Sequence, residues 1–380
     1  MTFLPSARTS KILDKKRLTT AAQEERIRAI LSERGLYGLD ISGVWLERVF
    51  EAYRQPHRHF HTTQHILDIC ELIRERSWDD PAMASELLLT ALFHDVIWYP
   101  LDGNCERRSV DALEYVMAQC NNPVPTQPLN NVRKLILATK KQEDINETAR
   151  RFMEYDCHDI LSGNPVDLLA YEFQIFQEYQ CLNMVDYRKG RATFFTRFAK
   201  RFPQCRATMD FLMEYQKRRR PRIGIYAGTF NPFHIGHLAI LEKAEMMFDK
   251  VIVAVGINPQ KGYIGKDETL SRILPFHEVI YFDTLMVDLL DQESKLSDVT
   301  LIRGLRNGYD LDYEMNQLRY MQEMRPDTNC VYIPCNKELE HISSSALKGF
   351  AMFDLHGRDS MYYPKKYSYY HRSIEELFHL

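Results

Sequence analysis

The chain has 380 residues, 45% of them apolar, and carries a formal net charge of -3. This length suits two domains that each bury a core, and a pI near 6.5 excludes general nucleic-acid binding, which needs a basic face. The sequence shows no run approaching the ~20 apolar residues of a membrane span, and its cysteines lack the paired spacing of a disulfide or zinc framework. We therefore expect a cytoplasmic protein.

The predicted organisation has a helical half followed by an α/β half. Its parts are an N-terminal extension (1–35), a helical metal domain (36–215), a basic linker (216–221), an α/β domain (222–355) and a C-terminal tail (356–380). The basic run at 217–220 ends directly before Pro221, and we interpret it as a solvated linker. In the tail, Ile374, Leu377 and Phe378 share one face, which predicts a terminal helix.

The first half carries histidines and carboxylates at the ends of predicted helices. Four histidines, at positions 57, 59, 61 and 65, lead into an apolar run with helical spacing. A second helix is predicted to begin with Asp80 as N-cap and Pro81 at its first position, and to end at His94-Asp95. Asp156 follows later in the chain. Imidazole nitrogens and carboxylates together suit divalent transition metals.

This pattern resembles that of HD-domain phosphohydrolases over roughly residues 40–205. The resemblance implies an all-α fold and a manganese, iron, nickel or zinc ion held by four residues, namely His65, His94, Asp95 and Asp156. Such a metal activates water and polarises phosphoryl oxygens. No glutamate follows Asp95 within a turn, where some HD hydrolases keep a catalytic acid, and Glu106 is the candidate substitute. Metal binding is therefore favoured over hydrolysis, and a nucleotide-sensing or oligomer-stabilising role stays open.

The second half opens with a strand, a glycine turn and a helix that begins at two histidines. The strand is predicted at 223–226, the turn at Gly228, and the helix from Gly236 onward. A helix start offers unpaired N–H groups and the positive end of the helix dipole, which attract phosphate. His234 and His237 lie on one side of that turn. We therefore predict a nucleotide site here.

Later segments extend this motif in a recognisable order. They are a strand at 251–255 with a loop at 258–261, a strand at 299–302 with Arg303-Gly304-Leu305-Arg306, the segment 310–314, and Ile342-Ser343-Ser344-Ser345. Over residues 222 to about 350 the chain resembles HIGH-type nucleotidylyltransferases, and within them the phosphopantetheine adenylyltransferase family. The resemblance implies a Rossmann-like α/β domain with a parallel sheet. The family's reaction is attack of a substrate phosphate on the α-phosphorus of ATP, with Mg²⁺ accompanying the ATP.

The same resemblance assigns roles to individual residues. Catalysis, which rests on positioning and charge stabilisation, is expected from His237, Lys261, Arg303, His234 and Thr229. Nucleotide binding is expected from Gly228, Phe230, Gly236, Arg306, Glu314, Ser343, Ser344 and Ser345. The acceptor is expected to contact Thr229, Lys261, Leu285, Met286 and Arg303. Pyrophosphate then leaves without a protein nucleophile, and Mg²⁺ is held largely by phosphate oxygens.

The acceptor is predicted to be 4′-phosphopantetheine, giving dephospho-coenzyme A in coenzyme A biosynthesis. Asn231 and His234 make the first motif more like the nicotinamide mononucleotide adenylyltransferase version, whereas Arg303 to Glu314 favour phosphopantetheine. Nicotinamide mononucleotide therefore stays open as an acceptor, as does a nucleotide-binding regulator with a silent transferase site. From the resemblance we also expect a homo-oligomer, and a bifunctional chain if the first half is a hydrolase.

Overall fold

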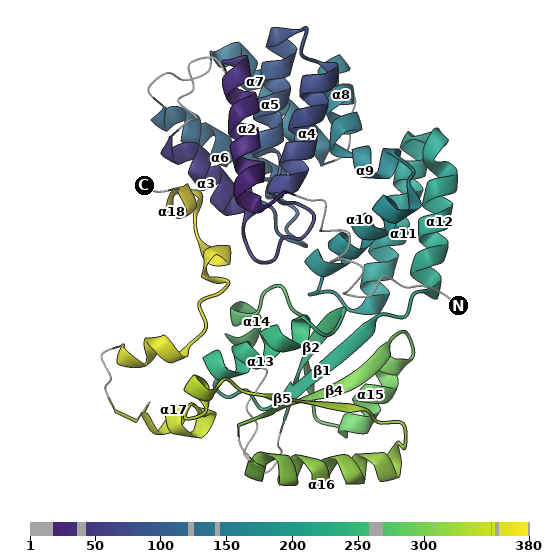
Figure 1. Cartoon of the computed structure of the whole chain (residues 1–380), viewed down its shortest axis with the longest axis vertical. Coiled ribbons are helices and arrows are strands. Elements are labelled where there is room, and N and C mark those ends of the chain that lie inside the picture. The colour runs from purple at the N-terminus through teal and green to yellow at the C-terminus, as the bar shows by residue number, and fades with distance from the viewer. Residues whose placement is uncertain are drawn as a thin grey trace. The chain divides into compact units, whose positions relative to one another are not determined.

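A computed structural model describes most of the chain, in residues 18–35, 43–120, 125–140, 145–257, 269–306, 308–350, 352–353 and 357–378 (Figure 1). The chain divides into two compact units. An α/β unit contains Tyr179–Ser368, and a helical unit contains the described residues from 18 to Glu178 together with those from Tyr369 onward. The division thus follows Glu178, before the last two helices of the predicted metal domain, and the helical unit is built from two separate stretches of sequence.

The helical unit packs around one apolar helix. Its helices are α2 (Thr20–Arg34), α3 (Val44–Tyr53), α4 (Thr63–Arg76), α5 (Pro81–Phe93), α6 (Cys105–Gln119), α7 (Thr126–Thr139), α8 (Glu147–Asp156), α9 (His158–Leu161), α10 (Pro165–Glu178) and α18 (Ile374–Phe378). Helix α5 is apolar on nearly every side and contacts α2, α4, α6, α7 and α8, as a core helix should. No helix within the described ranges is both long and apolar enough to cross a bilayer.

The start of α5 confirms the prediction from sequence. Asp80 accepts a hydrogen bond from the Met83 N–H at 3.0 Å, and Pro81 occupies the first helical position, where its missing N–H costs nothing. The helix ends at Phe93, with His94 as its C-cap. His94 and Asp95 therefore leave from the end of a buried and rigid element.

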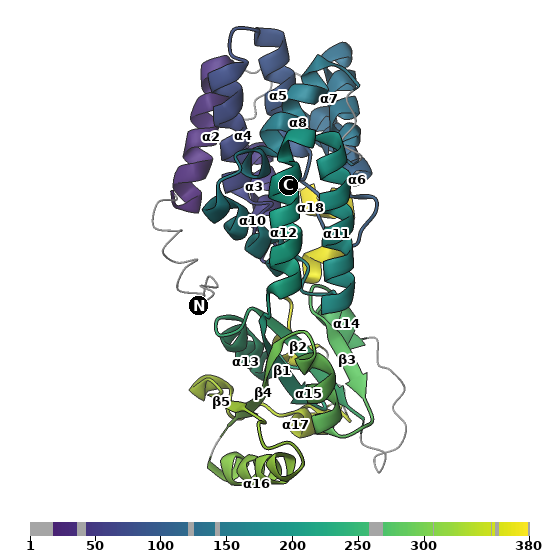
Figure 2. The same cartoon turned by 90° about the vertical axis from the view of Figure 1, so that its right-hand side faces the viewer.

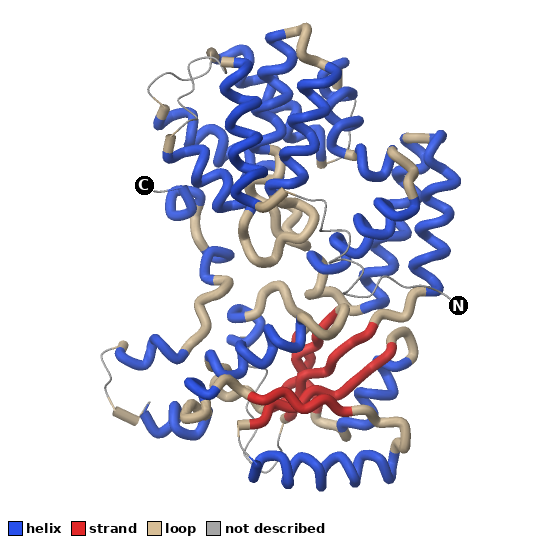
Figure 3. Tube along the Cα trace, in the orientation of Figure 1, coloured by secondary structure: helices blue, strands red, loops and turns tan. Residues whose placement is uncertain are grey.

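The α/β unit contains a fully parallel sheet, as the sequence predicted (Figure 3). Its strands are β1 (Arg222–Gly228), β2 (Lys250–Gly256), β3 (Val279–Phe282), β4 (Asp298–Leu305) and β5 (Cys330–Pro334), in the order β3-β2-β1-β4-β5. Its helices are α11 (Met184–Arg201), α12 (Arg206–Arg218), α13 (Ile235–Glu245), α14 (Thr269–Ile273), α15 (Met286–Ser294), α16 (Gly308–Met324) and α17 (Ser344–Phe350), with short 3₁₀ turns at Pro203–Cys205, Lys337–Leu339 and Arg358–Tyr362. A further 3₁₀ turn, Ser368–His371, lies where the chain passes into the helical unit. The strand order reverses direction at β1, so a crevice is expected where β1 and β4 end.

Helices cover both faces of this sheet (Figure 2). The connection from β1 to β2 runs in the opposite direction across the sheet from the connections that lead to β4 and β5. Right-handed crossovers therefore place α13 on one face and α15 and α16 on the other. Gly304 in β4 allows α13 to pack closely, since a Cβ atom there would lie 2.3 Å from Ile240 Cδ1.

Helices α11 and α12 are part of the α/β unit. Buried cations bind the segments next to these helices to the sheet. Lys250, at the start of β2, is 2% exposed and donates a hydrogen bond to the Leu182 carbonyl at 2.7 Å. Its ammonium also lies 3.0 Å from a carboxylate oxygen of Glu278. The segment before α11 is thereby fixed to β2.

The basic run before β1 is not the solvated linker that the sequence suggested. Lys217 and Arg218 form the last turn of α12, whereas Arg219 is only 6% exposed and lies 3.8 Å from the Asp249 carboxylate. Arg220 donates to Asp298 at 2.9 Å and also to backbone carbonyls before β4. These arginines fasten α12 to the sheet, because their carboxylate and carbonyl partners come from distant turns.

Candidate functional site

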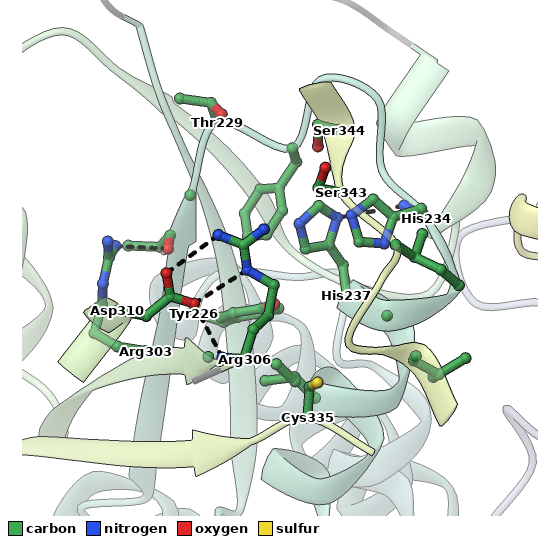
Figure 4. A pocket seen from close by; sticks show the side chains of 18 of the residues that line it. Tyr226, Thr229, His234, His237, Arg303, Arg306, Asp310, Cys335, Ser343 and Ser344 are labelled. Carbon is green, nitrogen blue, oxygen red and sulfur yellow. Dashed lines mark hydrogen bonds and ion pairs between the residues drawn. The ribbon is translucent and has the colours of Figure 1, made fainter. Parts of the chain in front are cut away.

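A cavity of about 330 Å³ opens at the carboxyl ends of β1 and β4, where the strand order reverses (Figure 4). Twelve of the predicted residues line it: Gly228, Thr229, Phe230, His234, Gly236, His237, Arg303, Arg306, Glu314, Ser343, Ser344 and Ser345. Further lining residues, to which the sequence assigned no role, are Tyr226, Ala227, Ile240, Gly304, Asp310, Cys335, Leu339 and Ile342. Segments from β1 to α17 thus converge on one site.

The two histidines form a stacked pair at the start of α13. Their ring centroids lie 3.7 Å apart, and the His234 N–H donates to His237 Nδ1 at 3.3 Å. Because Nδ1 of His237 accepts, its Nε2 carries the proton of the neutral ring and is the donor available to a ligand. A Cβ atom on Gly236 would lie 3.0 Å from the His234 ring, so the absence of a side chain at Gly236 leaves room for this ring.

Both imidazoles are neutral near pH 7. Burial, followed by the positive charge of Arg306, lowers the pKa of His234 to about 4. Burial and the neighbouring His234 hold the pKa of His237 well below its usual value. The site therefore presents neutral N–H donors beside arginine cations, an arrangement that suits phosphate oxygens.

We expect the α/β unit to lose stability as the pH falls below about 6.5. The folded-state pKa of His234 is about 4, below the value of 6.5 for an ordinary imidazole. Protons therefore bind the unfolded state first, and the resulting loss grows from zero above pH 7 to about 3 kcal/mol at pH 4. Hydrogen exchange of β1 amides, corrected for intrinsic rates, measures this loss. His234→Asn should flatten the dependence, and an unchanged profile would contradict the assignment.

Two arginines at the cavity are held by carboxylates. Arg303 makes a bidentate pair with Glu314, with both N–O distances at 2.6 Å, and its remaining Nη donates to the Ala227 carbonyl at 2.8 Å. Arg306 pairs with Asp310 at 3.1 Å. The sequence assigned Arg303 to phosphates and Glu314 to the nucleotide, but in the structure these two side chains bind each other. The pair with Glu314 therefore holds the Arg303 guanidinium in place at the end of β4.

Removing the Glu314 carboxylate should destabilise the α/β unit. Glu314→Ala leaves the half-buried Arg303 guanidinium without its bidentate partner, and we expect a loss of about 2 kcal/mol in the free energy of unfolding. Glu323→Ala on the exposed face of the same helix, α16, is the matched control. Denaturant unfolding followed by hydrogen exchange of β4 measures both. Equal effects of the two variants would show that the pair contributes nothing.

The other predicted residues of the α/β unit are the serines at the start of α17, the pair Leu285 and Met286, and Lys261. Ser343 accepts from the Ala346 N–H at 3.1 Å, as a helix cap does, and Ser344 donates to the Pro232 carbonyl at 3.0 Å. Leu285 precedes α15 and is 57% exposed, and neither it nor Met286 lines the cavity. Lys261 lies outside the described residues.

A second cluster lies in the helical unit. One potential ligand atom from each of His65, His94, Asp95 and Asp156 lies within 4.8 Å of the others. The Asp156 carboxylate is 3.1 Å from His65 Nε2 and 3.3 Å from His94 Nε2, and His94 Nε2 is 3.1 Å from Asp95. Helices α4, α5 and α8 therefore bring together the four residues that the sequence selected.

The donor set of this cluster fits a divalent cation. His94 Nδ1 lies 3.0 Å from the Ala91 carbonyl, which leaves Nε2 to face the carboxylates as a ligand atom. Although burial disfavours a charged imidazole, Asp95 and Asp156 raise the pKa of His94 well above its usual value. Burial likewise opposes ionisation of Asp95, yet His94 and His61 lower its pKa to about 2. Two half-buried carboxylates thus face the two imidazoles, and a divalent metal ion would supply the positive charge that balances them.

His61 and Glu178 also belong to this site, although the sequence analysis gave neither of them a role. Glu178 is 1% exposed and accepts the N–H groups of residues 59, 60 and 61 at 2.8 to 2.9 Å. Its second oxygen lies 2.7 Å from His61 Nδ1, and His61 Nε2 lies 3.7 Å from Asp95. The cluster of histidines in the sequence pointed to His61. Glu178, far along the chain, had no local signal.

The candidate acid, Glu106, lies in the first turn of α6. Burial raises its pKa, and the nearby charge of Asp95 adds to this effect. Lys140 opposes it, with its ammonium 3.9 Å from the Glu106 carboxylate. The charge of the cluster therefore affects the pKa of Glu106, but Glu106 is not one of the four candidate ligands.

Comparisons with known proteins place the α/β unit in a family. Residues 225–350 match the family model described as cytidylyltransferase-like, so this unit is a nucleotidyltransferase domain. The chain is 37% identical over 144 residues to the phosphopantetheine adenylyltransferase of Bartonella quintana, spanning 34% of this chain and 81% of that protein. The enzymes of that name from Streptococcus pneumoniae (34% identity, 36% of this chain, 86% of that protein) and Buchnera aphidicola (33%, 38% and 90%) are similar.

Because the chain covers most of each relative, it belongs through its α/β unit to the phosphopantetheine adenylyltransferase family. The cavity at the ends of β1 and β4 is therefore the candidate nucleotidyltransferase site, and the predicted membership is confirmed for this unit.

Proposed function

We propose that the α/β unit transfers the adenylyl group of ATP to 4′-phosphopantetheine, giving dephospho-coenzyme A and pyrophosphate. The observation that carries this proposal is the convergence of His237, Arg306 and the serine segment 343–345 on one cavity at the switch point of the sheet. These groups are donors or cations, which transfer between phosphates requires. The choice of phosphopantetheine as the acceptor is supported by the similar proteins, which are named phosphopantetheine adenylyltransferases.

In this mechanism the protein positions two phosphates and stabilises charge. The neutral His237 donates from Nε2 to an oxygen of the α-phosphate, where negative charge grows in the transition state. Arg306 adds a nearby cation, and Thr229 holds the incoming phosphate in line with the leaving pyrophosphate. The lining carboxylates Asp310 and Glu314 are paired with arginines, which supports substrate MgATP carrying its ion on phosphate oxygens.

A pyrophosphate-release assay with phosphopantetheine and nicotinamide mononucleotide side by side tests the acceptor. We expect turnover with phosphopantetheine and only background release with the mononucleotide. Turnover of the mononucleotide alone would replace the acceptor and keep the reaction class. No release with either, while ATP still binds, would favour a nucleotide-binding regulator.

We further propose that the helical unit is an HD-type domain that binds a divalent transition metal, manganese, iron, nickel or zinc, through His65, His94, Asp95 and Asp156. The convergence of these four residues is the observation in its favour. When bound, such an ion supplies Lewis-acid polarisation of a phosphoryl oxygen. Glu178 holds His61 beside Asp95, so a small phosphoester at the cluster would contact an imidazole as well.

Elemental analysis of the purified protein, followed by assays on small phosphoesters and nucleotides, tests this second proposal. We expect bound transition metal and weak phosphoester cleavage that chelation abolishes. Metal without cleavage would favour a sensory or structural role. A chain that neither contains nor takes up metal would overturn the proposal.

A further inference from the structure

The last residues of the chain are part of the helical unit. After Ser368 the chain leaves the α/β unit, and Tyr369 to Phe378 form what we term the C-terminal segment. Its helix α18 packs against α6 and α3, and Phe378 is 1% exposed (Figure 1). The helical unit is therefore completed only by residues that follow the transferase unit in sequence.

Tyr369 contacts a buried histidine of the helical unit, His57. Its hydroxyl lies 2.7 Å from His57 Nδ1, and the two rings stack with centroids 5.6 Å apart. The other nitrogen of His57, Nε2, lies 2.8 Å from the Trp98 carbonyl. Burial and the charge of Arg58 lower the pKa of His57 to about 3, so the ring is neutral and has one donor and one acceptor.

This neutral state sets the direction of both hydrogen bonds. A carbonyl oxygen can only accept, so His57 Nε2 must carry the proton and donate to Trp98. Nδ1 is then the acceptor, and the Tyr369 hydroxyl donates to it. His57 is 4% exposed, so loss of the Tyr369 hydroxyl would remove a hydrogen bond from a nearly dry site.

Trp98 connects this pair to the metal cluster. Its ring stacks on His61 with centroids 4.4 Å apart and planes inclined by 20°. His61 in turn faces Asp95 at 3.7 Å. Arg58 fastens the same loop, since its guanidinium donates to the Asp95 carbonyl at 2.7 Å and to the Val96 carbonyl at 3.0 Å. The backbone that carries Asp95 is therefore held from the side of His57 as well as from α5.

We propose that Tyr369 and His57 are positioning residues for the cluster of His65, His94, Asp95 and Asp156. Through these two residues the C-terminal segment sets the positions of Trp98, His61 and Asp95. The proposal rests on the metal site proposed above. Partners outside the ligand shell commonly tune metal affinity by orienting the ligands. The cluster would then reach its full affinity only in a chain that includes the C-terminal segment, which is synthesised after the transferase unit.

Tyr369→Phe in the full-length protein tests this role, because it removes one hydroxyl and keeps the ring. The probe is Co²⁺, whose visible absorption reports the geometry of its ligands. We expect Tyr369→Phe to weaken Co²⁺ affinity by about fivefold, below the 10- to 100-fold range for direct outer-shell partners, and to shift the absorption band. Tyr320→Phe, at a site 63% exposed on α16, should match the wild type.

A merely structural role of Tyr369 predicts something different. Near-UV circular dichroism and the thermal midpoint show whether each variant is folded at the temperature of the titration. A lower midpoint with unchanged Co²⁺ affinity and spectrum would overturn the inference, as would no change at all. His57→Gln, which keeps a side-chain donor and acceptor, should retain more affinity than His57→Ala, and equal losses would also count against it. A wild-type chain that binds no Co²⁺ would instead remove the metal site itself, and this inference with it.

Discussion

His237→Ala is expected to lower kcat for adenylyl transfer by at least about 100-fold, the loss typical for removal of one transition-state donor. His237 is the residue whose Nε2 proton is available to the cavity, because its Nδ1 already accepts from the His234 N–H. The charge it stabilises grows during the reaction, so KM for ATP should change much less than kcat. Steady-state pyrophosphate release at saturating acceptor measures both constants.

His371→Ala is the matched control, because this histidine is exposed and belongs to the helical unit. It should leave kcat unchanged. If His237→Ala also left kcat unchanged, the cavity would not be the catalytic site. If KM alone rose, His237 would contribute to ground-state binding and not to the transition state.

Asp156→Asn is expected to weaken transition-metal binding in the helical unit by more than about 100-fold, the upper end of losses seen when only an outer-shell partner is removed. The Asp156 carboxylate lies within 3.3 Å of both imidazoles, so it is central to the cluster. An amide is a poorer ligand than a carboxylate and carries no charge. Metal content after purification and titration calorimetry measure the loss.

Asp79→Asn, an exposed position just before α5, is the control and should retain the metal. Adenylyl transfer should be unaffected in Asp156→Asn, because this residue belongs to the other unit. Retention of metal by Asp156→Asn would show that the ion binds elsewhere.

Several features of the fold were readable from short stretches of sequence. The start of α5 at Pro81 with Asp80 as its cap, the strands near 223–226 and 251–255, and the helix after His234 all appear in the structure. Each depends on neighbouring residues alone: a side chain that caps an N–H, a proline that presets φ, or an apolar run of the right period. The ligand candidates His65, His94, Asp95 and Asp156 came from the resemblance to HD-domain phosphohydrolases, and the structure brings these four side chains together.

Pairings between distant residues could not be read from the sequence. Arg303 and Glu314 were both predicted to contact the substrate, but their pairing with each other was not predicted. Arg219, in a run of basic residues typical of a solvated linker, is buried next to Asp249. In both cases the partner lies on another element, and only the packing of strands and helices brings it near.

The sequence by itself therefore determined the transferase class of the second half, through a turn with two histidines and the motifs that follow it. For the first half it predicted a divalent-metal site made of imidazoles and carboxylates. Tertiary structure decided which groups support them. The strand order that opens the cavity beside β1, the burial of Glu178 against His61, and the return of Tyr369 to His57 all depend on long-range chain closure. Such contacts depend on how the apolar faces of distant elements pack together. A short stretch of sequence does not show which distant residues this packing will bring near.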